Sequence, residues 1–213
     1  MIEKIAKYFR LVKFSHTIFA MPFALMAFAY ALWSTEAEFS WWLLLQVVLC
    51  MVFARNVAMG FNRWADRKFD AENPRTANRE IPSGQISPRK ALAFVTINAL
   101  LFIVTACTIN TLTAILSPVA LAVVMFYSYC KRFTSLAHLV LGLSLGIAPV
   151  GATIAVLGEI TPESIVLAIG VMCWSAGFDI IYALQDAAFD RERGLHSIPA
   201  RFSARTALII SAA

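Results

Sequence analysis

The sequence predicts an all-α protein, a bundle of membrane-spanning helices around a central cavity that opens to the cytoplasm. Hydrophobic residues make up 60% of the 213 residues and charged residues only 15%, whereas a soluble domain carries about 25% charged residues. Long apolar runs recur along the chain, and basic residues are confined to alternate connections between them. These observations indicate a multi-pass integral membrane protein embedded in the lipid bilayer.

Six apolar runs follow one another, and most approach the ~20 residues that a helix needs to cross about 30 Å of hydrocarbon. They cover residues 16–33, 41–61, 91–109, 115–130, 136–157 and 165–184. The fourth run is short and contains Pro118, so we expect its helix to be tilted, kinked or extended at one end. A seventh span begins near Ala204 and reaches about half its length by residue 213. We therefore expect a single membrane-embedded domain over 1–213 that is truncated at its C-terminus.

Basic residues mark one side of the predicted bundle. The connections at 34–40, 110–114 and 158–163 contain neither lysine nor arginine, and all 18 basic residues fall on the other side. By the positive-inside rule, that side is cytoplasmic. We therefore expect the N-terminus and the active site on the cytoplasmic side of a bacterial inner membrane. The net charge of +5 follows from this topology, and no nucleic-acid partner is expected.

Two pairs of aspartates share one spacing. Asp66 and Asp70 follow the second apolar run, and Asp186 and Asp190 follow the sixth, 120 positions further on. Because residues three, four, seven and eleven apart share a helix face, each pair continues inward as a polar stripe. The stripes comprise Arg55, Asn62, Asp66 and Asp70, and then Asp179, Tyr182, Asp186 and Asp190. Ionisable residues at membrane depth are costly unless they face a wet cavity, so we expect the stripes to face each other across one.

Each aspartate pair alone is consistent with a solvated helix end, because like charges four residues apart destabilise a helix by only about 0.2–0.5 kcal/mol. Two such pairs on one membrane side favour a shared site. Four converging carboxylates would repel one another unless a cation lay between them, and Mg²⁺ suits carboxylates together with substrate phosphates. We predict a membrane enzyme that handles a diphosphate, with Mg²⁺ bound by the catalytic residues Asp66, Asp70, Asp186 and Asp190.

Basic residues cluster beside the first aspartate pair, at Lys68, Arg75 and Arg79. Guanidinium groups offer forked donors to phosphate oxygens and stay charged. We predict Lys68 and Arg79 as diphosphate contacts and leave Arg75 open, because topology alone explains some of these charges. Lys131 and Arg132 also lie at the cytoplasmic mouth, where they would meet an anionic co-substrate, although topology explains this pair equally well.

These residues carry a resemblance to a known family. Asn62-x-x-x-Asp66-x-x-x-Asp70, followed by Arg75-Thr76-Ala77-Asn78-Arg79-Glu80-Ile81-Pro82-Ser83-Gly84, resembles the first signature of the UbiA-type membrane prenyltransferases. Tyr182-x-x-x-Asp186-x-x-x-Asp190 resembles the second signature. The segment Ala65-Asp66-Arg67-Lys68-Phe69-Asp70 is similar to the sequences of the 4-hydroxybenzoate polyprenyltransferase branch of the family.

The resemblance implies a helical bundle, usually of nine spans, with a central cavity closed by cytoplasmic loops. The aspartate motifs would hold Mg²⁺ against the diphosphate of a polyprenyl donor, and the isoprenoid tail would leave toward lipid. An aromatic carboxylate acceptor such as 4-hydroxybenzoate would receive the prenyl group in ubiquinone biosynthesis. Asn62 would orient metal or phosphate, while Asp179 and Tyr182 would support the second motif or help to place the acceptor.

Two positions depart from the family pattern. Arg63 stands where the family often has aspartate, and His196 stands near the position of a common lysine, so the acceptor is left open. The segment Gly60-Phe61-Asn62-Arg63-Trp64, together with Leu184-Gln185-Asp186, is also similar to a subgroup linked to menaquinone made by the futalosine route, whose acceptor would be 1,4-dihydroxy-6-naphthoate. The role of His196 is not assigned, and His138 is expected to be an interfacial packing residue.

Three other interpretations of the sequence are open. A CDP-alcohol phosphotransferase would place its aspartates in one compact motif, which this sequence lacks. A cation-coupled transporter would place carboxylates near the bilayer midplane between broken helices, whereas these pairs lie at helix mouths beside a basic patch. An inactive chain is the third interpretation, because helices missing from a truncated sequence would leave the cavity open.

Overall fold

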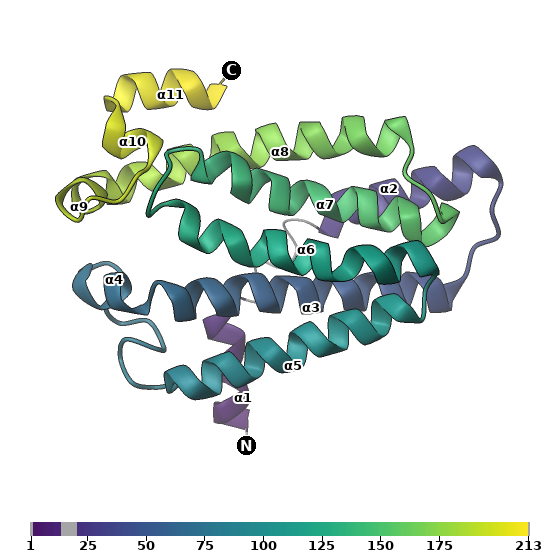
Figure 1. Cartoon of the computed structure of the whole chain (residues 1–213), viewed down its shortest axis with the longest axis horizontal. Coiled ribbons are helices and arrows are strands. Elements are labelled where there is room, and N and C mark those ends of the chain that lie inside the picture. Colours follow the sequence, from purple (N-terminus) through teal and green to yellow (C-terminus); the bar gives the residue numbers. More distant parts are fainter. Residues whose placement is uncertain (1, 14–20, 213) are drawn as a thin grey trace.

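The protein is built entirely from helices in the part of the chain that the structure, a computed structural model, describes: residues 2–13 and 21–212. Figure 1 shows long helices running roughly alongside one another, with shorter helices at one end. The elements are α1 (Ile2–Leu11), α2 (Met21–Thr35), α3 (Trp41–Ala65), α4 (Arg67–Glu72), α5 (Pro88–Cys107), α6 (Thr111–Cys130), α7 (Ala137–Leu157), α8 (Pro162–Ala183), η2 (Leu184–Asp186), α9 (Ala187–Glu192), α10 (Ile198–Arg201) and α11 (Ala204–Ala212).

The predicted membrane spans correspond to these long helices. Within the described residues, five helical segments are long and apolar enough to cross a membrane, namely α3, α5, α6, α7 and the segment that begins with α8. The first predicted span is represented by α2, an apolar helix of 15 residues, while residues 14–20 lie outside the described part of the chain. The predicted start of a further helix near Ala204 is confirmed by α11.

Local sequence signals set the ends of the long helices. The side chains of Ser40, Ser87, Asn110 and Thr161 each accept a backbone N–H bond at the start of α3, α5, α6 and α8, which satisfies one of the free donors of a first helical turn. α7 ends at Gly158, whose φ of 73° is accessible to glycine at little cost. The fourth predicted span is extended by a turn at its start, and its proline lies inside α6.

Close packing of α7 against α8 forms one wall of the bundle. A side-chain carbon added at Gly146 would lie 2.7 Å from the backbone oxygen of Ala168, and one at Gly142 would collide with the oxygen of Met172. Glycine therefore allows the two backbones to approach closely, as is common between membrane helices. α2 packs against α7, and α3 packs against α5 and α6.

The two ends of the bundle differ in charge. In Figure 1, α4 and α9 lie at the same end, and the connections α2–α3, α5–α6 and α7–α8 lie at the other. These three connections are the ones that contain no lysine or arginine. Both aspartate motifs, 120 residues apart in sequence, therefore share the basic end of the molecule.

Candidate active site

Each aspartate motif lies where a long apolar helix is interrupted. α3 ends at Ala65, and Asp66 takes φ −91° and ψ 6° before α4 begins. α8 ends at Ala183, and the 3₁₀ turn η2 then joins it to α9. Each predicted polar stripe therefore extends over more than one helical element.

The two aspartates of each motif have different surroundings. The first aspartates, Asp66 and Asp186, line a cavity between the helices. The second aspartates, Asp70 and Asp190, are buried, with 7% and 3% of their surface exposed, and do not contribute to the cavity lining. In the described part of the chain, the first aspartate of each motif therefore lines the cavity and the second does not.

The aspartates of the first motif bind two arginines. Arg132 donates from Nη2 to Asp66 Oδ1 at 3.2 Å, and Asn62 donates from Nδ2 to Asp66 Oδ2 at 3.1 Å. Arg79 donates from Nη1 to Asp70 Oδ1 at 2.7 Å. Burial raises the pKa of the Asp66 carboxyl, and the hydrogen bond from Arg132 opposes this rise.

The aspartates of the second motif are also paired with cations. Arg75 donates from Nε to Asp186 Oδ1 at 2.8 Å and also binds Asp186 through Nη2. Asn73 donates to the same Oδ1 at 3.0 Å, and the hydrogen bond with Asp186 raises the pKa of Arg75. Lys131 lies 3.7 Å from Asp190, measured from Nζ to Oδ2. Each of the four motif aspartates therefore has its own basic partner.

The carboxylates retain unused acceptors. Asp70 Oδ2 and Asp190 Oδ2 are buried and have no hydrogen-bond partner among the described residues. No three histidine, cysteine or acidic residues in the described part of the chain lie in an arrangement ready to hold a metal ion. Buried carboxylate oxygens that accept no hydrogen bond are costly, so these two oxygens keep the capacity to bind a further cation.

A cavity of about 350 Å³, here called the polar cavity, lies between α3, α6, α7 and α8. Seven predicted site residues line it: Asn62, Asp66, Arg79, Lys131, Asp179, Tyr182 and Asp186. Arg75, whose role was left open, also lines it, as do Arg63 and Lys13. The predicted residues Asp70, Lys68, Arg132 and Asp190 do not. Lys68 and His196 are both exposed, and neither lines the cavity.

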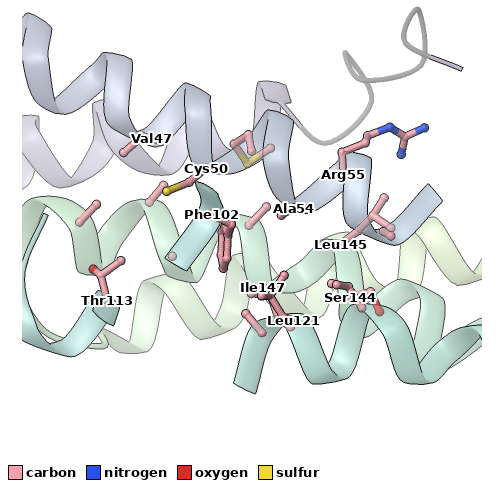
Figure 2. Close-up of a pocket in the computed structure, with 18 of the residues that line it drawn as sticks. Val47, Cys50, Ala54, Arg55, Phe102, Thr113, Leu121, Ser144, Leu145 and Ile147 are labelled. Atoms are coloured by element: carbon pink, nitrogen blue, oxygen red, sulfur yellow. The ribbon is translucent and has the colours of Figure 1, made fainter. Parts of the chain in front are cut away.

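A second chamber of about 170 Å³, here called the apolar pocket, adjoins the polar cavity. Its walls come from α3, α5, α6 and α7 and are almost entirely apolar, as Figure 2 shows for side chains such as Val47, Phe102 and Leu121. Arg55 lies at one end of the pocket, with its guanidinium directed away from Val47. The two chambers share five lining residues, Arg55, Met59, Tyr127, Leu141 and Leu145. A polar space thus lies directly beside an apolar one.

Sequence reasoning missed several polar residues around the cavity. His138 was expected to pack at the membrane interface, but it is fully buried and its Nδ1 lies 2.6 Å from Asp179 Oδ2. The need of a carboxylate at membrane depth for a partner could have pointed to a histidine. Ser128 and Ser175 also line the cavity, and no sequence signal marks them, because serine is common in membrane helices.

The fold and this site define a polytopic integral membrane protein with a charged cavity at one end of its helix bundle. The chain belongs to the UbiA prenyltransferase family, whose model matches residues 20–213.

Individual relatives agree with this assignment. The 4-hydroxybenzoate octaprenyltransferase of Photobacterium profundum is 37% identical over 163 residues, which cover 76% of this chain and 57% of the relative. The enzyme of the same name from Albidiferax ferrireducens is 36% identical over 166 residues, covering 78% and 56% respectively. The chain thus spans little more than half the length of these curated relatives.

Solved structures share the fold. The apo structure of a UbiA homologue from Aeropyrum pernix K1 has a TM-score of 0.84 and 34% identity, covering 92% of this chain and 73% of that chain. A UbiA homologue from Archaeoglobus fulgidus bound to GPP and Mg²⁺ has a TM-score of 0.78 at 22% identity, covering 97% and 72%. The second similarity extends to the fold alone.

Proposed function

We propose that this protein transfers a polyprenyl group from a polyprenyl diphosphate to a hydroxylated aromatic carboxylate of the 4-hydroxybenzoate type, in quinone biosynthesis. The observation that carries the proposal is the position of the apolar pocket directly beside the polar cavity, with five lining residues in common. A prenyl diphosphate has an anionic head and an apolar tail, and the two chambers offer each part a matching environment. The names of the relatives, 4-hydroxybenzoate octaprenyltransferases, support the same reaction.

Basic residues at the cavity provide for the diphosphate. Arg75, Arg79 and Lys131 line the polar cavity and are held there by the motif aspartates. Guanidinium groups bind phosphate oxygens through paired hydrogen bonds, and a shielded site strengthens this attraction. We infer that these three side chains bind the diphosphate of the donor and stabilise the charge that grows on it as the allylic carbon–oxygen bond breaks.

The aspartates fit a magnesium site. The buried Oδ2 atoms of Asp70 and Asp190, which accept no hydrogen bond from the described residues, are hard oxygen ligands, which Mg²⁺ prefers. We infer that Asp66, Asp70, Asp186 and Asp190 hold Mg²⁺ directly or through water, with Asn62 orienting Asp66. When bound, Mg²⁺ supplies Lewis-acid stabilisation of the diphosphate leaving group. The structure of the Archaeoglobus fulgidus homologue bound to GPP and Mg²⁺ supports this inference.

Arg55 is suited to bind the carboxylate of the acceptor. It lines both chambers, and its Nε is buried without a hydrogen-bond partner among the described residues. A buried guanidinium donor without a partner is costly at membrane depth, and an aromatic carboxylate would satisfy it. The apolar walls around it also exclude water, which would otherwise trap the allylic cation.

The basic residues at one end of the bundle indicate the side of the membrane to which the cavity opens. Since lysine and arginine concentrate on cytoplasmic connections, we infer that the polar cavity opens to the cytoplasm, in the inner membrane of a bacterium. The acceptor and the diphosphate head would then enter from the cytoplasm, and the prenyl tail would extend toward lipid.

The test uses membranes that contain the full chain, supplied with Mg²⁺ and a polyprenyl diphosphate. We would offer 4-hydroxybenzoate and 1,4-dihydroxy-6-naphthoate separately and detect prenylated products by mass spectrometry. Product from 4-hydroxybenzoate is the expected outcome, and product from the naphthoate alone would move the protein to menaquinone biosynthesis. Transfer to neither acceptor, together with cation uptake into proteoliposomes, would favour a transporter and overturn the proposal.

A further inference from the structure

A third space, here called the outer groove, lies between α5, α6, α7 and α8 and measures about 340 Å³. Its walls are apolar except for Thr113 and Ser117, and its α8 residues belong to the half of that helix remote from Asp186. Four of its lining residues keep 42% to 56% of their surface exposed, namely Val119, Leu143, Ile165 and Ile169. The groove therefore opens on the surface of the described bundle, where a membrane helix meets lipid tails that are as apolar as leucine.

The outer groove and the apolar pocket have walls in common. Five residues line both spaces: Phe102, Thr113, Ala120, Ile147 and Gly151. Figure 2 shows Phe102, Thr113 and Ile147 on the side of the apolar pocket. The outer groove and the polar cavity share no lining residue in the described part of the chain. The apolar pocket therefore lies between the other two spaces, and the three follow one another from the aspartate motifs to the surface of the bundle.

Gly151 on α7 lies where the apolar pocket and the outer groove meet. Gly142 and Gly146 on the same helix allow close contact with the backbone of α8, because an added side-chain carbon would collide there. A side-chain carbon added at Gly151, in contrast, would meet no atom of the described residues within 4 Å. Glycine destabilises a helix relative to alanine, and close packing gives no reason for it at this position. The absence of a side chain at Gly151 instead leaves open space between the two chambers.

The apolar pocket is small for a polyprenyl tail. Its volume is about 170 Å³, whereas the pocket of a drug-sized ligand measures about 300–1,000 Å³, and a tail of many isoprene units is larger than such a ligand. Because contact with water is unfavourable for a hydrocarbon chain, the remainder of the tail has to lie on apolar protein or in lipid. The outer groove supplies a further apolar space of about 340 Å³ beside the pocket, on the way to lipid.

We propose that the tail of a long prenyl donor passes Gly151 from the apolar pocket into the outer groove, and that Gly151 is the residue that allows the protein to use long donors. This inference rests on the proposed function and specifies how the length of the donor is accommodated. A geranyl tail ends within the apolar pocket, whereas the tail of a longer donor extends past Gly151 to the outer groove. A large side chain at Gly151 therefore excludes long donors and spares short ones.

The experiment measures kcat/KM for geranyl diphosphate and for octaprenyl diphosphate with the full chain, at the same Mg²⁺ and acceptor concentrations. The test variants are Gly151→Ala, Gly151→Phe and Ile169→Trp, of which the last changes the outer groove alone. Gly170→Phe is the matched control. It makes the same change on α8, where an added side-chain carbon also meets nothing within 4 Å among the described residues and where the glycine lines none of the three spaces.

The expected result is that Gly151→Phe lowers kcat/KM for octaprenyl diphosphate by about tenfold to a hundredfold and changes that for geranyl diphosphate by less than about twofold. Ile169→Trp causes a smaller loss in the same direction. Gly151→Ala stays close to wild type, because its side-chain carbon fits the open space. Gly170→Phe keeps the wild-type ratio between the two donors.

A second measurement locates the tail directly. A long prenyl diphosphate that carries a photoreactive benzophenone at the far end of its tail is bound with Mg²⁺, irradiated, and the labelled peptides are identified by mass spectrometry. In wild type we expect the label on outer-groove residues such as Val119 and Ile169, and we expect Gly151→Phe to lose it. A purely structural role of Gly151 would not move the label.

An unchanged ratio between the two donors in Gly151→Phe would overturn the inference while leaving the proposed function intact, provided that wild type transfers the prenyl group. A wild-type label outside the outer groove would overturn it as well, and would leave the groove to the acyl chains of membrane lipids. Equal loss of both donors in Gly151→Phe would assign Gly151 to folding and would also overturn it. Wild type that transfers from neither donor would overturn both the inference and the proposed function.

Discussion

Arg75, in the loop after the first aspartate motif, donates to Asp186 of the second motif, 111 residues further along the chain, through Nε at 2.8 Å and through Nη2. The same guanidinium reaches the hydroxyl of Tyr182 at 3.4 Å and lies over its ring. A forked arginine–carboxylate pair is directional. It therefore fixes the loop after α4 against the end of α8 and closes one side of the polar cavity.

Replacement of Asp186 by asparagine is expected to abolish prenyl transfer. The change removes a predicted metal ligand and the charge that holds Arg75, so we expect transfer to fall at least about a hundredfold. The measurement is product formation in membranes that contain equal amounts of inserted protein. Near-normal turnover by Asp186→Asn would show that Asp186 is not a metal ligand. Glu159→Gln, in the connection at the opposite end of the bundle, is the control.

Arg79 and Lys68 are expected to behave differently, although sequence alone predicted both as diphosphate contacts. Arg79 lines the polar cavity and binds Asp70, whereas Lys68 is exposed and outside the lining. We expect Arg79→Ala to raise the donor KM by about tenfold or more and Lys68→Ala to change it by less than about twofold. Steady-state kinetics with varied donor provide the comparison. Equal effects would show that Lys68 reaches the diphosphate from its exposed position.

Replacement of Arg55 is expected to affect the acceptor more than the donor. Loss of a buried guanidinium that binds a carboxylate should raise the acceptor KM by about tenfold to a hundredfold. Arg55→Lys should retain part of the affinity, because it keeps the charge but not the fork. The two KM values, measured for Arg55→Ala and Arg55→Lys, decide this. A change in donor KM alone would place Arg55 at the diphosphate instead.

Magnesium dependence should vary with pH in a defined direction. Burial raises the pKa of Asp66 above its ordinary value of 3.8, so this carboxyl keeps its proton to a higher pH than an exposed aspartate. A proton competes with a metal ion for a carboxylate. The apparent affinity for Mg²⁺ should therefore fall as the pH drops toward this raised pKa and recover as the pH rises. Transfer assays with Mg²⁺ titrated at several pH values test this, and chelation by EDTA should abolish activity. A Mg²⁺ requirement that is constant wherever the protein stays folded would contradict the expectation.

Two glycines allow a test of the packing between α7 and α8. A Cβ at Gly142 would collide with the backbone oxygen of Met172, whereas a Cβ at Gly170 would meet nothing within 4 Å. We expect Gly142→Ala to lower the free energy of unfolding by about 1–3 kcal/mol. Gly170→Ala, the matched control, should be neutral or stabilise by about 0.5–1 kcal/mol, because alanine loses less backbone entropy in a helix. Thermal unfolding in detergent measures both, and equal stability of the two variants would show that the helices can separate without cost.

The spans were predicted accurately because a membrane-spanning helix depends only on residues close together in the chain. A helix that crosses hydrocarbon must satisfy its own backbone hydrogen bonds and be apolar along its length, so five described spans could be placed closely from composition alone. The same holds for the shared end of Asp66 and Asp186, because alternate connections must lie on alternate sides of a membrane. Arg55 and Asp179 were linked to an internal cavity by the cost of charge at membrane depth, and Asp179 does line it.

Tertiary structure alone decided how the site is assembled. The breaks after Ala65 and Ala183, which separate the roles of the two aspartates in each motif, leave no pattern that periodicity can reveal. The bonds from Arg75 to Asp186 and from His138 to Asp179 join residues 111 and 41 positions apart, so no local spacing encodes them. The sequence by itself determined the spans, the shared end of the two aspartate motifs and the type of ligand groups, because each depends on residues close together in the chain. Which carboxylate meets which cation depended on helix packing, because partners at such separations are brought together only when the helices assemble.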